Sequence, residues 1–215
     1  MSKAGDTVYP SGYEQHHEDK KTIEQRQHLL NAILGDHSKE ISEDLDTDLF
    51  EVMKRRRSTR KFDMKPVEDW KVEKILAAAD TAPTAGNFQG FEIFYIKNNK
   101  TKEKLVEASN NQPYVNSPIV LVYCKNPSRV KLQFPDKMLS KFAVQDATLA
   151  AAYSQLAATA LGLSTIWIGM IDEKKVAEII GTDLIPSSIL CIGYPVKRKH
   201  PKPRRNLSEL IHIIE

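Results

Sequence analysis

The sequence predicts one α+β domain preceded by an N-terminal extension. Its 215 residues suffice for a single domain with a sizeable core, and 41% apolar with 27% charged residues is the balance of an ordinary folded protein. Segments with helical spacing are mixed with short, continuously apolar runs that predict buried strands. Because these segments do not follow strict β–α–β alternation, they favour a sheet flanked by helices over a doubly wound parallel sheet.

Residues 1–46 are predicted to be an extension rather than part of the core. Residues 1–16 show no periodicity, and the helical spacing of Glu18–Leu34 ends at Gly35, a common helix stop. A polar, acidic linker follows, and no apolar signal-peptide core is present. We therefore expect residues 1–46 to pack on another surface, such as a second subunit, and residues 47–215 to form the domain.

The first half of the domain predicts three helices and two strands. Thr47 is expected to cap the first helix, whose apolar residues Leu49, Phe50 and Met53 lie on one face. Pro66 is expected to open the second helix. In chain order the elements are helix Asp48–Arg56, helix Val67–Ala82, strand Phe91–Lys97, helix Thr101–Ser109 and the continuously apolar, hence central, strand Ile119–Cys124.

The sequence of the second half predicts two helices and two core strands, followed by a short terminal helix. Asp172 is expected to cap one helix and Gly181 to end it. The stretch Ala147–Ile171 has no formal charge, but Gln155 and the break at Gly162 indicate a buried helix and a strand rather than a membrane span. The predicted elements are helix Ser140–Leu161, strand Ser164–Ile168, helix Glu173–Ile180 and strand Ile189–Gly193.

The charge and the cysteine content exclude several function classes. The net charge of +3 is too small by itself to indicate nucleic-acid or membrane binding. Cys124 and Cys191 lie in apolar runs, which is typical of buried, inert thiols and of a reducing, cytoplasmic location. The neighbouring His16 and His17 lack a second set of ligands with clear spacing, so we predict no metal site.

A run of basic residues, Arg55-Arg56-Arg57-Ser58-Thr59-Arg60, follows the first helix. Closely spaced guanidinium groups repel one another unless an anion lies among them, and arginine forms bidentate hydrogen bonds with phosphate oxygens. The run therefore indicates a phosphate site. A solvated helix end that complements the helix dipole is the alternative interpretation.

Three further segments have the composition of ligand-binding loops. The loop Ala82–Gln89 has small residues that let a flat ligand approach the backbone, with amide side chains that can hydrogen-bond a polar ring edge. The turn Ile166–Met170 has a glycine at a strand end, where backbone N–H groups are exposed. A basic segment follows Gly193–Pro195 and extends to Arg205. Each of them alone also fits an ordinary turn or a solvated surface.

Taken in order, these segments resemble the nitroreductase family over residues 48–215. The resemblance rests on four motifs: Arg56-Arg57-Ser58-x-Arg60, Ala82-Pro-Thr-Ala-Gly-Asn-x-Gln89, Trp167-Ile-Gly169, and Gly193-Tyr-Pro195 with Pro203-Arg-Arg205. It implies a three-layer sandwich in which helices flank a central mixed, mostly antiparallel sheet. It also implies a homodimer with FMN bound at the subunit interface.

The resemblance further implies which residues bind the FMN. The basic motif would hold the phosphate and the ribityl chain, with Arg60 directed towards the pyrimidine edge. The loop would run along the flavin, the turn after Trp167 would face N5, and the C-terminal arginines would close on the phosphate. The implied set is Arg56, Arg57, Ser58, Arg60, Pro83, Thr84, Asn87, Gln89, Ile168, Gly169, Met170, Arg204 and Arg205.

The implied reaction passes a hydride from NADH or NADPH through the flavin to an electron-poor acceptor in two half-reactions. Nitroaromatics, quinones, enones and free flavins are all candidate acceptors. A cation such as Arg60 would stabilise the negative charge that develops on the flavin, and no protein nucleophile is needed. Another flavin reaction (reductive dehalogenation, flavin breakdown or dehydrogenation) and a non-catalytic FMN-binding regulator remain alternatives.

The chain departs from the family pattern in its loop. Thr84 stands where serine is commoner, and Gly90-Phe91 stands where Pro-Trp is usual. Asp146, at the start of the uncharged helix, is expected to be a structural partner, with an ion pair to an interface arginine as the alternative. Among the aromatic residues, Trp70 and Trp167 are expected in the core, and Tyr114 and Phe134 are expected near the substrate.

Overall fold

The structure, a computed structural model, describes residues 48–200 and 202–214 of the chain. The predicted N-terminal extension, its helix Glu18–Leu34 and the predicted cap Thr47 lie outside the described residues.

Within residues 48–200 and 202–214, five strands form one sheet. Their bounds are β1 Phe62–Asp63, β2 Phe91–Tyr95, β3 Ile119–Lys125, β4 Ser164–Ile168 and β5 Ile185–Pro195. The long strand β5 pairs with β3, β4 and β1, and β3 pairs in turn with β2. Each of these strand pairs is antiparallel, and a parallel contact occurs as an isolated bridge between Ser58 and Thr165. The predicted mostly antiparallel sheet is confirmed.

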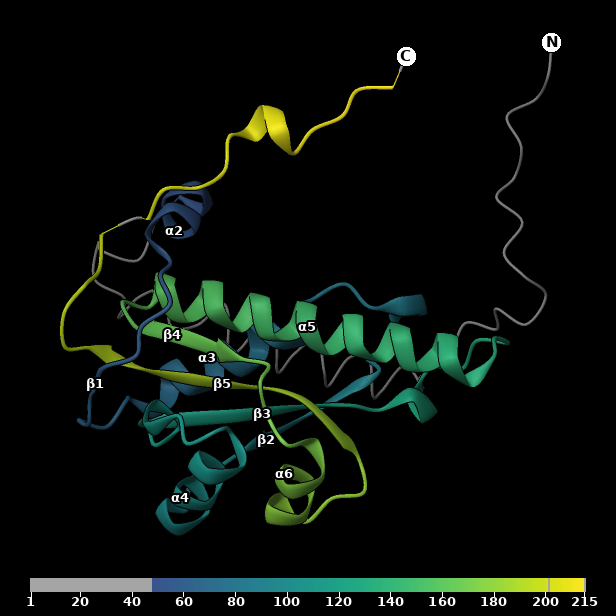
Figure 1. Cartoon of the computed structure of the whole chain (residues 1–215), viewed down its shortest axis with the longest axis horizontal. Coiled ribbons are helices and arrows are strands. Elements are labelled where there is room, and N and C mark those ends of the chain that lie inside the picture. Colours follow the sequence, from purple (N-terminus) through teal and green to yellow (C-terminus); the bar gives the residue numbers. More distant parts are fainter. Residues whose placement is uncertain (1–47, 201, 215) are drawn as a thin grey trace.

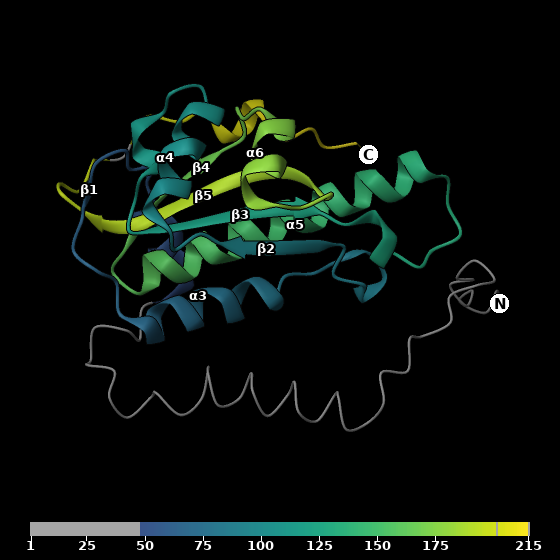
Figure 2. The same cartoon turned by 90° about the horizontal axis from the view of Figure 1, so that it is seen from below.

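Helices cover both faces of this sheet, which gives the predicted three layers (Figures 1 and 2). Helices α3 (Asp69–Asp80) and α5 (Asp136–Ala160) lie on one face, and α4 (Asn99–Ala108) and α6 (Glu173–Ile180) lie on the other. Successive side chains of a strand point to opposite faces, so a strand covered on both sides must be apolar throughout. In β3, Leu121 packs in the core under α3 and α5, whereas Val122 packs in the core under α4 and α6.

The capping residues and prolines in the sequence predict the ends of some helices correctly and those of others incorrectly. Helix α6 has the predicted bounds, with the Asp172 side chain accepting a hydrogen bond from the Lys175 N–H and with Gly181 in the left-handed conformation. Helix α2 (Leu49–Arg55) begins after Asp48, whose side chain accepts from the Phe50 N–H at 3.1 Å. Helix α3 begins at Asp69, two residues after the predicted start at Val67, and α5 begins four residues before the predicted start at Ser140.

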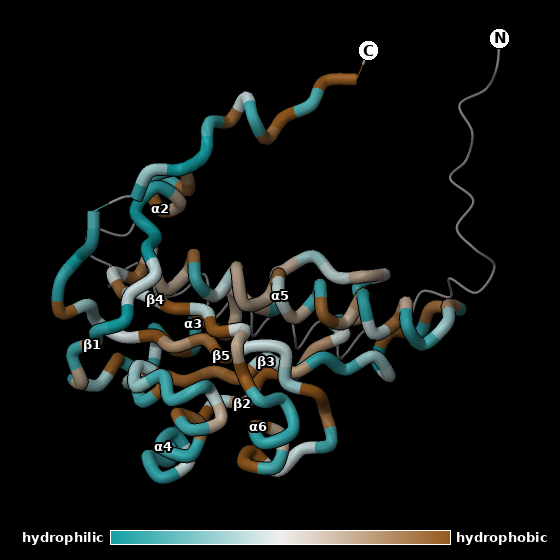
Figure 3. The backbone as a smooth tube through the Cα atoms, in the orientation of Figure 1, coloured by the Kyte–Doolittle hydropathy of each residue, from teal (hydrophilic) through white to brown (hydrophobic). Residues whose placement is uncertain are grey.

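Two expectations, about Trp167 and the C-terminus, are wrong for the single chain. The apolar residues Leu49, Phe50 and Met53 of α2 are exposed, and Phe50 is 74% accessible. Trp167, predicted in the core, is 42% accessible. The terminal helix is reduced to a 3₁₀ turn, Leu207–Glu209, in a segment that runs past α2 and away from the sheet (Figure 1). Figure 3 shows hydrophobic residues along this projecting segment.

The uncharged stretch Ala147–Ile171 belongs, as predicted, to α5 and β4. No helix among the described residues has both the length and the hydropathy needed to span a bilayer.

Candidate functional site

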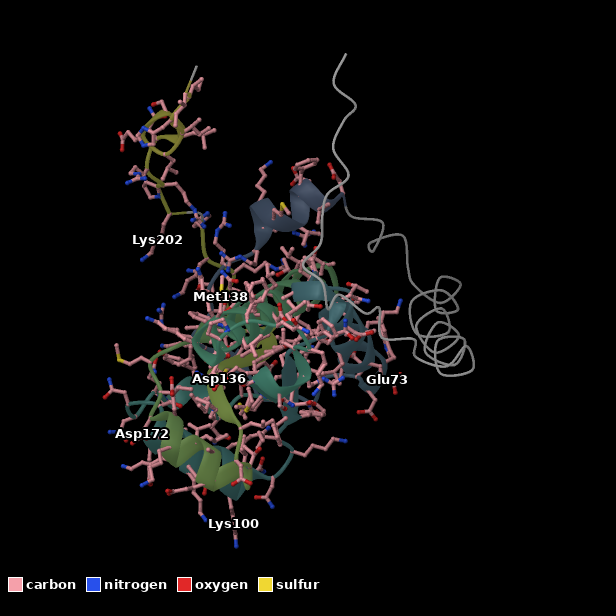
Figure 4. The ribbon with its side chains drawn as sticks, turned by 90° about the vertical axis from the view of Figure 1, so that its right-hand side faces the viewer. Glu73, Lys100, Asp136, Met138, Asp172 and Lys202 are labelled. Carbon is pink, nitrogen blue, oxygen red and sulfur yellow. The ribbon has the colours of Figure 1, made fainter. Side chains whose placement is uncertain are left out.

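A basic cavity of about 610 Å³ lies between the end of α2 and the C-terminal segment. Its lining residues are Met53, Lys54, Arg56, Arg57, Ser58, Arg60, Lys199, His200, Lys202, Pro203 and Arg204. Figure 4 shows Lys202 on the C-terminal segment, beside the body of the domain. The first and fourth motifs of the sequence, which are separated by more than half of the chain, therefore meet in one place.

The backbone after α2 explains how the basic motif faces this cavity. The helix ends because Arg56 leaves the helical conformation, and the Thr59 N–H then donates to the Thr165 carbonyl oxygen of β4 at 2.9 Å. Thr59 is buried against β4, whereas its neighbours Ser58 and Arg60 are exposed. The alternation of an extended segment thus directs Ser58 and Arg60 away from the core.

The cavity lining contains five lysine and arginine side chains besides Lys54 and Arg57, and no carboxylate of the described residues. Burial lowers the pKa of Arg56, and the positive charges of Arg204 and Arg57 lower it further. Like charges held together in this way are stabilised by an anion between them. The cavity therefore has the charge of a phosphate site.

Arg57 borders this cavity and a second one. The second cavity has a volume of about 280 Å³, and Arg55, Arg57 and Arg198 are among its lining residues. The Arg57 side chain donates through Nη1 to the Arg56 carbonyl oxygen at 2.6 Å, and its buried Nε has no hydrogen-bond partner among the described residues. Unlike the first cavity, the second has a carboxylate in its lining, Glu51, which pairs with Lys54 at 3.0 Å.

The loop 82–89 is held in an unusual conformation by its own side chains. Gly86, Asn87 and Gln89 have φ values of 57°, 58° and 46°. These values lie in the left-handed region, which residues other than glycine seldom adopt. The Thr84 hydroxyl oxygen accepts from the Gln89 N–H at 3.2 Å, and Gln89 Nε2 donates to Asn87 Oδ1 at 2.8 Å. Three of the predicted flavin contacts therefore form one hydrogen-bonded network.

Asp146 of α5 holds both ends of this network. Its Oδ1 accepts from the Ala85 N–H at 2.9 Å and its Oδ2 accepts from the Gly90 N–H at 3.0 Å, while the residue is only 2% exposed. Of the two interpretations of Asp146, the structural one is confirmed, because the partners are backbone amides of the loop. The sequence contained a signal for this contact, since the glycine at position 90 has an N–H that the usual proline lacks.

The turn after β4 exposes its backbone as predicted. Ile168 is buried, whereas Gly169 and Met170 are exposed. The Trp167 indole lies over Gly169, so that a Cβ atom at position 169 would lie 3.0 Å from the ring. The Met170 carbonyl oxygen accepts from Gln112 Nε2 at 3.3 Å, which ties the turn to the segment after α4.

The loop and the basic cavity lie at opposite ends of the sheet in a single chain. Both positions can be referred to strand β5. Phe91, just after the loop, pairs with β3 at a level that corresponds to Ile185 of β5. Ser58 forms a bridge with Thr165, which pairs with Ile192 of β5. Phe91 and Ser58 are therefore roughly 23 Å apart along the strands and roughly 19 Å apart across them. Figure 2 shows β2 entering the sheet at the end opposite β1. One chain thus brings together only part of the predicted FMN site.

Other candidate residues are placed as follows. Arg205 lies outside the cavity lining and pairs with Glu209 at 3.9 Å, so Arg204 is the C-terminal arginine beside Arg56. The Arg60 guanidinium lies 5.8 Å from the centre of the Tyr114 ring, which places Tyr114 beside the cavity. Phe134 instead packs edge-on against Phe142, with ring centres 5.8 Å apart.

The two cysteines are buried and unpaired, as predicted. No group of three or more metal-ligating side chains occurs among the described residues. The histidines His16 and His17 lie outside those residues.

Comparison with known proteins identifies the family. The family model described as nitroreductase family matches residues 53–118 and 115–194, and the chain belongs to this family. An Archaeoglobus fulgidus protein with an inferred NADH dehydrogenase/NAD(P)H nitroreductase assignment is 31% identical over 151 residues, covering 67% of this chain and 83% of that protein. The FMN reductase [NAD(P)H] of Bacillus subtilis is 27% identical over 164 residues, covering 69% of this chain and 66% of the relative.

Among solved structures, the NADPH:FMN oxidoreductase of Vibrio harveyi complexed with NAD⁺ has a TM-score of 0.73 and 24% sequence identity. The match covers 79% of this chain and 78% of that chain. This similarity establishes the nitroreductase fold, which the sequence motifs predicted.

Proposed function

We propose that the chain is an FMN-dependent oxidoreductase that uses NADH or NADPH to reduce an electron-poor small molecule. The observation that carries this proposal is the cavity between α2 and the C-terminal segment, where Arg56 and Arg204 lie together and where no carboxylate from the part of the chain that the structure describes lines the wall. FMN has a dianionic phosphate that offsets this repulsion. The names of the relatives from Bacillus subtilis and Vibrio harveyi support the same cofactor and the same electron donor.

The side chains that line the cavity are of the chemical types that bind FMN. Arg56, Ser58 and Arg204 would hold the phosphate, because they combine guanidinium donors with a hydroxyl in one cavity. FMN, when bound, supplies the redox chemistry by accepting a hydride from the nicotinamide and passing electrons to the acceptor. Arg60 would hold positive charge near the pyrimidine edge, where reduction adds negative charge.

The turn at Gly169 and the loop 82–89 would complete the site. Gly169 and Met170 present exposed backbone at the end of β4, and the Gly169 N–H is the donor proposed to face the flavin ring. The loop residues Pro83, Thr84, Asn87 and Gln89 would run along the flavin. None of these roles requires a protein nucleophile or general acid.

We further propose that two copies of the chain form the site together. The separation between the loop and the basic cavity exceeds the length of one FMN, so the loop next to a given cavity would come from the second copy. Large apolar residues left exposed in the single chain support an interface. They are Leu49, Phe50 and Met53 of α2, Val144, Leu149 and Tyr153 of α5, Trp167 and Met170 after β4, and Leu207, Leu210, Ile211, Ile213 and Ile214 of the C-terminal segment.

The position of Trp167 is consistent with this interface. Ile166 and Ile168 point into the core beneath α4 and α6, so Trp167 points to the opposite face of β4, the face covered by α5. Leu149 and Tyr153 of α5 are also exposed. We propose that the second copy packs on this face, with residues 1–46 as a separate extension to the domain 47–215. The two reduced cysteines fit a cytoplasmic location.

Anaerobic absorption spectroscopy tests the reaction. We expect the purified protein to show flavin bands, or to acquire them with added FMN, and NADH or NADPH to bleach them. Addition of a nitroaromatic or a quinone should then restore the bands. Flavin that binds but does not bleach would instead favour a non-catalytic FMN-binding protein. Failure to bind FMN at all would contradict the proposal.

A further inference from the structure

We propose that Asp146 is a positioning residue that sets the affinity for FMN by holding the loop 82–89 in its binding conformation. This inference rests on the proposed FMN site. Asp146 belongs to α5 and accepts hydrogen bonds from the backbone of the loop. Its two carboxylate oxygens accept hydrogen bonds from the N–H groups of Ala85 and Gly90, which flank the stretch with Asn87 and Gln89.

The loop needs such support because its backbone is strained. Asn87 and Gln89 are both in the left-handed region, which disfavours residues with a Cβ atom. The Phe88 side chain between them is buried, so adjacent residues are directed outward. A free loop would relax to other conformations and would lose the network that joins Thr84, Asn87 and Gln89. Pre-organisation of this network lowers the entropic cost of binding a ligand.

A carboxylate fits this position better than other polar groups. Two backbone donors converge on Asp146, one on each oxygen, and an ionised carboxylate accepts at both. An asparagine would present an oxygen to one donor and an NH₂ group to the other, leaving one buried N–H opposed by a donor. Burial raises the pKa of Asp146, while the hydrogen bonds from Ala85 and Gly90 oppose that rise.

Gly90 and Asp146 depend on each other. A Cβ atom at position 90 would lie 2.7 Å from Val130 Cγ2 and 2.9 Å from Asp146 Oδ2, both closer than ordinary contact. A proline there, which the family pattern favours, would also remove the N–H that Asp146 accepts. Gly90 therefore supplies both the N–H and the space that the contact with Asp146 requires.

The test compares Asp146→Asn with a control on the same helix. Ser154 lies about two turns further along α5. It is fully buried, accepts from the Tyr123 hydroxyl at 2.7 Å and donates to the Ile75 carbonyl oxygen at 3.2 Å. Ser154→Ala therefore removes buried hydrogen bonds without touching the loop. For both variants and the wild type we would measure FMN affinity by flavin fluorescence, and amide hydrogen exchange across residues 82–91.

We expect Asp146→Asn to weaken FMN binding by about tenfold or more and to accelerate exchange in the loop. Ser154→Ala should lower the stability of the fold but leave both readouts close to the wild type. Unchanged FMN affinity and exchange in Asp146→Asn would overturn the inference, as would equal losses in the two variants. Failure of the proposed function is distinct, because the wild type would then bind no FMN whatever the exchange in the loop.

Discussion

Arg56 and Arg204 lie beside the same cavity although almost 150 residues separate them in the chain, and the charge of Arg204 lowers the pKa of Arg56. Arg56 is the residue after α2, where the chain leaves the helix, whereas Arg204 lies in the segment that crosses α2 on its way to the C-terminus (Figure 1). Such an arrangement is unfavourable without a ligand and favourable with an anion, so both arginines can be tested by their effect on ligand binding.

The first prediction concerns Arg56. Replacement by alanine should remove a charge-assisted hydrogen bond to the FMN phosphate, which corresponds to about 1.5–3 kcal/mol or roughly a 10–100-fold rise in the dissociation constant. Fluorescence titration with FMN measures this change. Arg129→Ala is the control, because Arg129 is paired with Glu92 at 3.5 Å outside the cavity lining. Equal FMN affinity in Arg56→Ala and the wild type would remove Arg56 from the site.

The second prediction is that FMN reverses the effect of replacing Arg204 on the melting temperature. Without FMN, Arg204→Ala should leave the melting temperature unchanged or raise it, because a repulsion with Arg56 is relieved. With saturating FMN, the same variant should melt below the wild type, because ligand binding contributes less stabilisation. Thermal melts with and without FMN make the comparison. A variant that is less stable by the same amount in both conditions would indicate a structural role for Arg204.

The sequence predicted those elements whose signals are local. Asp172 and Gly181 bracket α6 because a cap and a left-handed glycine act on their own neighbours. Pro66 gave a wrong start for α3, since Glu68 at the helix boundary forms no cap bond and accepts instead from the Tyr194 hydroxyl of β5. That contact links residues distant in the chain and has no signature in the sequence around Pro66.

Strand β5 and Trp167 show two further limits of prediction from the sequence. The predicted strand was Ile189–Gly193, whereas β5 runs from Ile185 to Pro195. Its start was missed because it contains Pro186, which is unusual in a strand, and a register shift between Tyr123 and Cys124 of β3 lies opposite. Trp167 was wrongly expected in the core although its neighbours Ile166 and Ile168 occupy the inward face, so the alternation of a strand could have corrected this expectation. The motifs indicated the residues of the site, but not that the two parts lie far apart in one chain.

The third prediction concerns the cysteines. Cys124 and Cys191 are inaccessible to solvent, and burial raises the pKa of each thiol to about 12. At neutral pH they should therefore resist a disulfide-exchange reagent in the folded protein, because the thiolate is the reactive form. Colorimetric titration should detect almost no thiol in the native state and both thiols in denaturant. Rapid labelling of the folded protein would contradict the burial of the two strands.

The fourth prediction concerns pH. The Tyr194 hydroxyl donates to Glu68 Oε2 at 2.6 Å, and Lys71 Nζ lies 3.2 Å from the same oxygen; the bond from Tyr194 is the main cause that lowers the pKa of Glu68 to about 2. A lowered carboxyl pKa stabilises the fold above the ordinary value near 4.5 and loses this effect as pH falls towards 2. The side chain is 49% exposed, so we expect at most about 1 kcal/mol.

Glu68→Gln should therefore be less stable than the wild type at neutral pH, and the two stabilities should converge as the pH falls from about 4.5 towards 2. Urea denaturation over this range measures the difference. Glu73→Gln on the same helix is the matched control, since Glu73 is an exposed carboxylate that points away from the domain (Figure 4). A difference between Glu68→Gln and the wild type that does not depend on pH would exclude an electrostatic origin.

The fifth prediction tests whether two copies share each site. If Arg56 of one copy and Asn87 of the other bind the same FMN, then Arg56→Ala and Asn87→Ala homodimers should each bind FMN weakly. A mixed dimer should contain one site with both substitutions and one site with neither. Random mixing after refolding should thus restore strong binding at about a quarter of all sites. If a single chain supplied both residues, every site in the mixture would carry one substitution, and mixing would restore nothing. Stoichiometric FMN titration before and after mixing distinguishes these outcomes, and chains of the same variant refolded alone serve as the control.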